Sequence, residues 1–273
     1  MQSAIAQAFI SRDEATPTFR NQTPGRLDPT PGSIDQQIKR FLDDLQTARR
    51  DRDRARNALH KVRIDALFRL AAAAEFKDND TGAHVLRMGH FSALIAAACG
   101  MDTDYCETIL YASRMHDIGK IGIPDAILQK PGKLTPEEWT IMKKHPEIGA
   151  ALLKDADNDL YRMSAEIALS HHEKYDGTGY PYSVAGEDIP LSGRIVAVAD
   201  FFDAVTMDRC YRPAMSDEAA LALLREGRGA HFDPKVIDAF FDVVDHLIAL
   251  RTQINRGETP PLRSQGSRAP GEA

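Results

Sequence analysis

The 273-residue sequence has little of what disulfide-stabilised or membrane-spanning proteins need. Its three cysteines are too few and too irregularly spaced for a disulfide framework, which favours a reducing compartment. No apolar run approaches the ~20 residues that a helix needs to cross a bilayer. The N-terminus also has no basic segment of the kind found in signal peptides. We therefore expect a cytoplasmic protein that does not enter a membrane.

An excess of positive charge is absent as well. The formal net charge is −6, which argues against binding a nucleic-acid polymer through the general surface. A small substrate that carries phosphate is still compatible with this charge if the protein's basic residues are concentrated at the binding site. The apolar fraction of 43% and the charged fraction of 27% are ordinary for a globular protein.

The first part of the chain changes character at Ile34. Residues 1–33 contain four prolines among Thr, Gly and Gln, and we expect a flexible leader. From Ile34 to Ala66, apolar residues alternate spacings of four and three, which is a heptad pattern. This pattern fits either one amphipathic helix lying on the domain or a parallel coiled coil that forms a homodimer. The polar opposite faces favour the homodimer, with 34–66 as a linker and dimerisation helix.

The remaining sequence predicts an all-α fold, because helical patterns follow one another without an alternating strand pattern. Thr135 begins a capping box with Pro136 at the first helical position. We expect a helical bundle over residues 64–254 with the long N-terminal helix before it, and a disordered tail over 255–273. The expected bundle helices include 85–99, 105–116, 160–170, 191–209 and 233–254.

Histidine and aspartate recur where regular structure does not require them. His116 and Asp117 are adjacent near the end of a predicted helix, and His171 and His172 precede a Gly-Thr-Gly-Tyr-Pro loop. Adjacent histidines on a helix point ~100° apart and cannot share one face, so such a pair indicates a site. Mixed nitrogen and oxygen ligands suit iron, manganese, zinc or cobalt better than magnesium. The sequence therefore predicts a transition-metal site.

Further residues add to this prediction. His145 starts a His-Pro-Glu-Ile-Gly turn, and His84 heads an earlier helix with Asp80 four residues before it. Asp200 lies within an apolar helix, where a buried unpaired carboxylate would cost several kcal/mol and a metal would remove that cost. We expect Glu173 and Asp203 to orient histidine ligands. His231 is expected to brace the last helix, and Arg194 to form a structural ion pair.

These motifs resemble the HD-GYP domains of the HD superfamily of metal-dependent phosphohydrolases. The resemblance covers residues from about 64 to 250 and is carried by five segments: 81–84, 116–120, 145–149, 171–181 and 200–212. It implies an all-helical domain that holds two or three metals, commonly iron or manganese. It also implies hydrolysis of the bacterial second messenger cyclic di-GMP to linear pGpG, and often on to GMP.

The resemblance also implies roles for individual residues. Metal ligands would be His84, His116, Asp117, His145, His171, His172 and Asp200, with Asp117 as a bridge. Asp80 stands where three-metal members have the longer Glu, so it is the candidate ligand of a third metal. Residues that hold the substrate would be Lys120, Tyr180, Arg209 and Arg212. The Gly-Tyr-Pro loop would dock diguanylate cyclase (GGDEF) domains.

The ligand set predicts a mechanism in which a hydroxide held between two metals attacks phosphorus in line. Asp117 would bridge the metals, and Lys120 would neutralise charge on the phosphoryl oxygens. Two other functions stay open: a non-catalytic regulator that binds the dinucleotide or a partner protein through the loop, and a phosphohydrolase of another cyclic nucleotide or dinucleotide.

Overall fold

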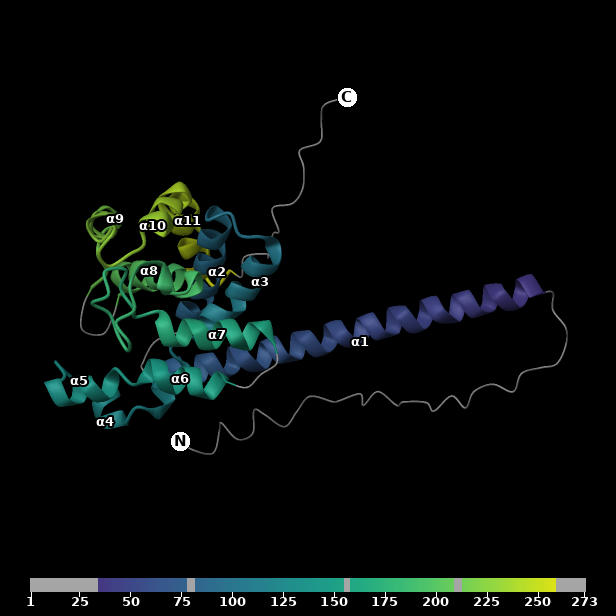
Figure 1. Ribbon diagram of the computed structural model, residues 1–273, viewed down its shortest axis with the longest axis horizontal. Coiled ribbons are helices and arrows are strands. Elements are labelled where there is room, and N and C mark those ends of the chain that lie inside the picture. The colour runs from purple at the N-terminus through teal and green to yellow at the C-terminus, as the bar shows by residue number, and fades with distance from the viewer. Residues whose placement is uncertain (1–33, 78–81, 155–157, 209–212, 259–273) are drawn as a thin grey trace, which may run out of the picture. The chain divides into compact units, whose positions relative to one another are not determined.

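The computed structural model describes residues 34–77, 82–154, 158–208 and 213–258. Within these ranges the chain is helical without a β-strand, which confirms the all-α prediction (Figure 1). None of the described helices is both long and apolar enough to cross a membrane. The predicted leader, and the predicted tail beyond residue 258, lie outside the described residues. The chain divides at Arg56 into two compact units.

The elements are α1 (Ile34–Lys77), α2 (Gly82–Ala98), α3 (Thr103–Ala112), the 3-10 turns η2 (Ser113–Met115) and η3 (Ile118–Gly122), α4 (Asp125–Leu128), α5 (Pro136–Met142), α6 (His145–Leu153), α7 (Asp159–Ser170), the 3-10 turn η4 (Gly186–Asp188), α8 (Leu191–Thr206), α9 (Asp217–Glu226), α10 (Pro234–Asp242) and α11 (Val244–Asn255).

Most helix ends follow from local sequence. Thr135 caps α5 through the predicted capping box with Glu138. Asp233 caps α10 by accepting from the backbone N–H of Lys235. The single helix expected over 233–254 is wrong, because the backbone leaves helical geometry at Val243 (φ −120°, ψ 11°) and α11 starts anew. The helix expected over 105–116 ends at Ala112, and two 3-10 turns follow.

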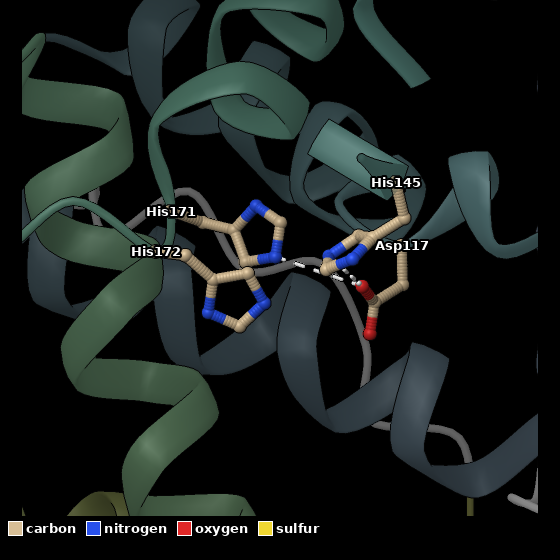
Figure 2. Close-up of side chains that lie close together, drawn as sticks. All are labelled: Asp117, His145, His171 and His172. Carbon is tan, nitrogen blue, oxygen red and sulfur yellow. Dashed lines mark ion pairs between the residues drawn. The ribbon is translucent and has the colours of Figure 1, made fainter. Parts of the chain in front are cut away.

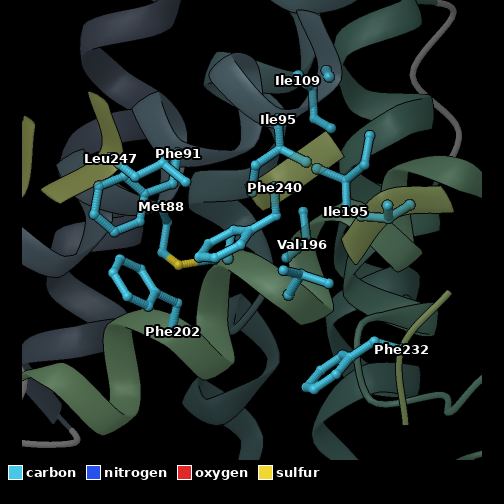
Figure 3. Packing of buried hydrophobic residues seen from close by; sticks show 14 of the residues in the cluster. Met88, Phe91, Ile95, Ile109, Ile195, Val196, Phe202, Phe232, Phe240 and Leu247 are labelled. Atoms are coloured by element: carbon cyan, nitrogen blue, oxygen red, sulfur yellow. The ribbon is translucent and has the colours of Figure 1, made fainter. Parts of the chain in front are cut away.

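The main core lies between α2 and α8 (Figure 3). Met88 and Phe91 of α2 and Phe202 of α8 are fully buried, and the rings of Phe91 and Phe202 lie 5.8 Å apart. This packing fixes α2 against α8, because close-packed side chains leave little freedom for either helix to shift. Both helices also carry candidate metal ligands.

The two parts of α1 differ in their surroundings. Leu67, Ala71 and Ala74 belong to a second buried cluster with Val85 and Ile118. The earlier heptad positions are 52–75% exposed in the described chain: Ile34, Ile38, Phe41, Leu45, Leu59 and Val62. The end of α1 is therefore part of the domain, whereas the side chains at the earlier heptad positions are exposed.

The last residue of α1 is tied to the segment that follows the His-Asp motif. The Lys77 ammonium donates to the backbone carbonyls of Ile121 (3.0 Å) and Ile123 (2.7 Å). It also pairs with Asp125 at 3.2 Å. Lys77 thus satisfies carbonyl groups at the end of η3, which a 3-10 turn leaves without partners of its own.

Candidate metal centre

Five separate segments bring the predicted ligands together. Asp117, His145, His171 and His172 form one group in which one ligand atom from each lies within 4.8 Å of the others (Figure 2). His84, His116 and Asp200 form a second group by the same measure. The ligands come from α2, the turn between η2 and η3, the start of α6, the end of α7 and α8.

Asp117 lies between the two groups. Its Oδ1 faces His145 Nε2 at 3.1 Å and His171 Nε2 at 3.6 Å. Its Oδ2 faces His116 Nε2 at 3.3 Å and the Lys120 ammonium at 2.8 Å. One carboxylate oxygen is therefore directed at each group, which is the arrangement that a bridging ligand requires.

Four of the histidine rings are oriented by hydrogen bonds at Nδ1. The acceptors are Asp203 Oδ2 for His84 (2.7 Å), Ser113 O for His116 (3.0 Å), Met142 O for His145 (2.8 Å) and Ile167 O for His171 (3.0 Å). A backbone carbonyl only accepts, so the Nδ1 facing it carries the proton in a neutral imidazole. The Nε2 lone pairs are then directed into the two groups, as metal ligation requires.

The protonation states agree with ligation. Burial lowers the pKa of both His171 and His172, so these imidazoles stay neutral. For Asp117, burial alone would raise the pKa of the carboxyl group. The charge of Lys120 is the largest opposing cause, and with the neighbouring His116 and His145 it holds this pKa well below its ordinary value. The site therefore presents two neutral imidazoles, those of His171 and His172, beside an ionised carboxylate.

Buried polar atoms test whether a metal fits this donor set. Asp117 Oδ1, His145 Nε2 and His171 Nε2 are buried and make no hydrogen bond within the described part of the chain. Buried polar atoms are rarely left in this state, because the cost is ~1–3 kcal/mol for each group. A divalent cation coordinated by these converging atoms would remove that cost. The donor set therefore fits divalent metal.

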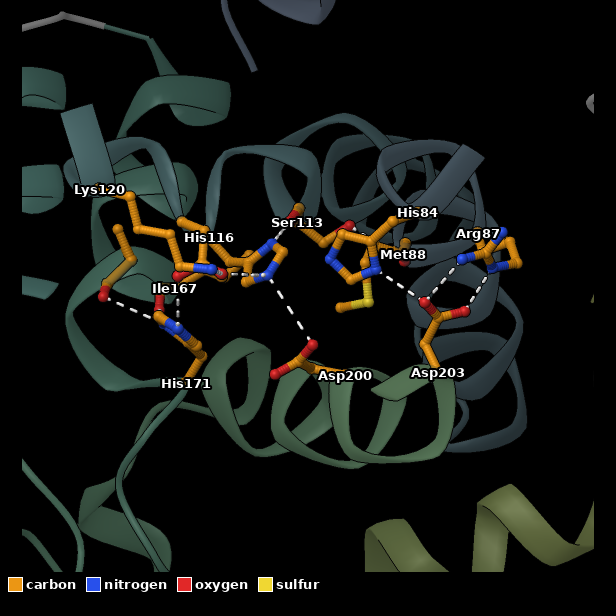
Figure 4. A network of polar contacts seen from close by, with 12 residues as sticks. His84, Arg87, Met88, Ser113, His116, Lys120, Ile167, His171, Asp200 and Asp203 are labelled. Carbon is orange, nitrogen blue, oxygen red and sulfur yellow. Dashed lines mark hydrogen bonds and ion pairs between the residues drawn. The ribbon is translucent and has the colours of Figure 1, made fainter. Parts of the chain in front are cut away.

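Asp203 orients a histidine of the second group through a hydrogen bond to His84 (Figure 4). It accepts from His84, as predicted, and from the buried Arg87 guanidinium, whose Nη2 lies 2.9 Å from Asp203 Oδ2. Burial would raise the pKa of Asp203, but the hydrogen bonds from His84 and Arg87 lower it to about 2. Arg87 was missed from the sequence, although an Arg three residues after His84 in an apolar helix was a usable signal.

The Gly-Tyr-Pro loop lies against the first group. Tyr180 stacks on the His172 ring with centroids 4.7 Å apart. Burial and the carboxylates of Asp117 and Asp200 raise the pKa of Tyr180, so its phenol stays protonated. The role expected for Glu173 is wrong: its carboxylate accepts from the backbone N–H groups of Tyr182 (2.7 Å) and Val184 (3.1 Å), not from a histidine. Glu173 braces the loop.

Other predicted residues have mixed outcomes. Asp200 is only half-buried, with 23% of its side chain exposed, so the expected cost of burying its charge was too high. Arg194 pairs with Asp233, as predicted. His231 stacks on Phe232 and joins neither group. Three candidates lie outside the described residues: Asp80, Arg209 and Arg212.

Gly119 allows η3 to approach α6 closely. A Cβ atom at this position would lie 1.9 Å from His145 O and 2.5 Å from Gly149 N, and both are backbone atoms that cannot rotate away. We expect Gly119→Ala to push Asp117 away from His145, to destabilise the domain by ~1–3 kcal/mol and to weaken metal binding at least ~10-fold. Urea unfolding and metal analysis would measure both effects.

The control for Gly119→Ala is Gly82→Ala at the start of α2. A Cβ at Gly82 meets no atom within 4 Å, so this variant should keep wild-type metal content and unfold no more easily. Equal metal binding by the two variants would contradict the close approach at Gly119.

Comparisons with known proteins agree with this geometry. The HD domain family profile matches residues 65–236. A Vibrio cholerae protein named cyclic di-GMP phosphodiesterase is 41% identical over 232 residues, which are 80% of this chain and 46% of that protein. The V. cholerae 3'3'-cGAMP-specific phosphodiesterase 2 is 41% identical over 196 residues, which are 72% of this chain and 38% of that protein.

A solved structure shows the same fold. The crystal structure of a cyclic GMP-AMP specific phosphodiesterase of V. cholerae superposes with a TM-score of 0.53 at 17% identity, covering 72% of this chain and 54% of that one. The chain spans less than half the length of the two curated relatives. Because the family profile covers more than half of its residues, the chain belongs to the HD domain family, and its motifs are consistent with the HD-GYP type.

Proposed function

We propose that this chain is a metal-dependent phosphodiesterase that hydrolyses cyclic di-GMP to linear pGpG and onward to GMP. The observation that supports it best is the convergence of imidazoles on two adjacent groups, with the carboxylate of Asp117 facing histidines of both. Adjacent metal sites with one bridging carboxylate are typical of phosphoryl-transfer hydrolases. The relative named cyclic di-GMP phosphodiesterase supports the choice of substrate.

Charge at the site explains why metal is needed. Asp117 and Asp200 carry negative charge, and Lys120 supplies one ammonium beside Asp117. These residues alone would repel the two phosphates of a cyclic dinucleotide. Bound divalent metals activate water and neutralise charge that develops on the phosphoryl oxygens.

The chain's own residues position the substrate. Lys120 is held at 2.8 Å from Asp117 Oδ2, with 15% of its side chain exposed, and its ammonium can contact a phosphate oxygen that enters the site. Tyr180 keeps its phenolic proton and is fixed by stacking on His172, so it can donate to the substrate. Both groups are pre-positioned, which lowers the entropic cost of orienting the phosphodiester.

We propose iron or manganese as the metal, because the resemblance to HD-GYP domains implies them and imidazole with carboxylate is compatible with both. We propose one ion for each group, with Asp80 as a candidate ligand of a third. The test is anaerobic purification, metal analysis, and incubation of the loaded protein with cyclic di-GMP, with products identified by mass spectrometry. We expect about two ions per chain and pGpG as the first product. Intact cyclic di-GMP in the presence of fully loaded protein would refute the proposal.

A second candidate substrate is 3'3'-cGAMP. The 41% identical relative named for this nucleotide supports it. The same assay with both dinucleotides at equal concentration separates the candidates through the ratio of kcat/KM values. We expect cyclic di-GMP to be preferred, and a ratio in favour of 3'3'-cGAMP would reassign the substrate.

We also propose that α1 forms a homodimer through its heptad seam. The seam residues of α1 are more than half exposed in the described chain, and a second copy would bury them as a coiled coil. Deleting residues 34–62 is expected to give a monomer in light scattering, because the deletion removes the seam but keeps Leu67, Ala71 and Ala74 in the domain. An unchanged mass would contradict the coiled-coil dimer.

A further inference from the structure

The short helix α5 presents the chain's single tryptophan to solvent. None of the α5 residues is buried, and Trp139 is 44% exposed. The helix itself is well defined, since Thr135 caps it and Pro136 occupies its first turn. Because Trp139 is not needed to fill a core, its large exposed ring calls for another explanation.

Trp139 is the outer end of a series of aromatic rings that starts at the metal ligands. The ring of His172 stacks on Tyr180 at 4.7 Å, and Tyr180 contacts Trp139 edge-on with centroids 6.3 Å apart. Tyr180 also lies 6.4 Å from the ring of His145. Trp139 is thus separated from two candidate metal ligands by one side chain.

A cation lies beside the rings of Tyr180 and Trp139. The Lys143 ammonium lies 5.9 Å from the Trp139 ring centroid and 5.5 Å from that of Tyr180. Lys143 directly follows α5 and lies two residues before His145. Trp139, Tyr180 and Lys143 therefore combine aromatic faces with positive charge, as sites for nucleotides do. A purely apolar protein partner would gain nothing from the ammonium.

We infer that Trp139 is a stacking platform for a purine base of the dinucleotide, and that Lys143 attracts the phosphate beside that base. This inference rests on the proposed function. While one phosphodiester is at the metal groups, a base of the same molecule extends outward along Tyr180 and covers the exposed face of Trp139. Stacking of a base on an aromatic side chain contributes ~1–3 kcal/mol and accepts any purine. Trp139 therefore acts in substrate binding and takes no part in bond breaking.

The test compares side chains of similar size with and without a π-face in the full-length, metal-loaded protein. Trp139→Leu is expected to raise KM for cyclic di-GMP roughly 5- to 140-fold with little change in kcat, the equivalent of ~1–3 kcal/mol. Trp139→Phe should recover most of the lost affinity. Lys143→Gln should also raise KM, whereas Lys133→Gln, on the exposed loop before α5, should not.

A binding measurement separates this inference from the proposed function. Since the chain has one tryptophan, its fluorescence reports only on Trp139, and saturating pGpG should quench it in the metal-loaded protein. Wild-type activity together with an unchanged KM in Trp139→Leu would overturn the stacking role alone. A Trp139→Phe variant as impaired as Trp139→Leu, or fluorescence that does not respond to pGpG, would also overturn it. A wild-type protein that leaves cyclic di-GMP intact would instead refute the proposed function.

Discussion

Asp117→Asn is expected to reduce the proposed hydrolysis of cyclic di-GMP by at least ~10²–10³-fold, the loss that follows removal of one group that stabilises transition-state charge. Asn keeps the shape of the side chain but removes the negative charge that both groups share. Oδ1 and Oδ2 of Asp117 face different histidines, so the substitution affects both groups at once. The Lys120 ammonium would also lose the carboxylate that it pairs with at 2.8 Å.

The assay should follow activity and metal content together. We expect Asp117→Asn to retain fewer ions per chain than wild type after identical loading, with an unchanged far-UV spectrum. Asp159→Asn is the matched control, because its carboxylate lies on the surface with 83% of the side chain exposed. A variant at Asp117 with full metal content and near-wild-type turnover would exclude a bridging role.

Arg87→Met should give the largest loss of stability. Arg87 and Asp203 are each 2% exposed in their side chains, and the guanidinium contacts both carboxylate oxygens. A second contact, 2.9 Å from Nη1 to Asn255 Oδ1, ties α2 to α11. Removing one partner leaves the other charge buried without compensation, which costs ~3–5 kcal/mol. Urea unfolding would show this as a lower midpoint at an unchanged slope.

The chain offers a matched control for this substitution. Arg228 and Asp238 also form a bidentate ion pair, with Nε 2.9 Å from Oδ1 and Nη2 2.7 Å from Oδ2. Their side chains, however, are 48% and 60% exposed. Arg228→Met should leave the unfolding midpoint almost unchanged, because solvent already screens the pair. Arg87→Met should also lower metal content, since Asp203 holds the ring of His84. Equal effects of the two substitutions would mean that burial does not set the cost.

The sequence could predict which candidate ligands lie together, because short motifs contain their residue types. His116 with Asp117, and His171 with His172, are contiguous pairs whose residue types alone indicate metal. Helix starts at Thr135 and Asp233 were predictable for a similar reason, since a cap acts within three residues. The all-α class followed from periodicity alone.

Contacts between distant segments could not be predicted in this way. The pairing of Arg87 with Asp203 joins α2 to α8, and no local pattern specifies it. Glu173 precedes the loop by several residues, so its bonds to Tyr182 and Val184 depend on how the loop folds back. The break at Val243 was not predictable either, because the residues on both sides of it have helical patterns.

The spread of the ligands along the chain has a consequence for folding. His84 and Asp200 are far apart in sequence, yet they belong to one group, so a bound ion closes a long loop. Closing a long loop removes conformational entropy from the unfolded chain, as a cystine bridge does in secreted proteins. Binding free energy at such a site is also folding free energy. In a chain with three cysteines, metal ions would serve as its cross-links, and a chelator would loosen the domain as reduction loosens a disulfide protein.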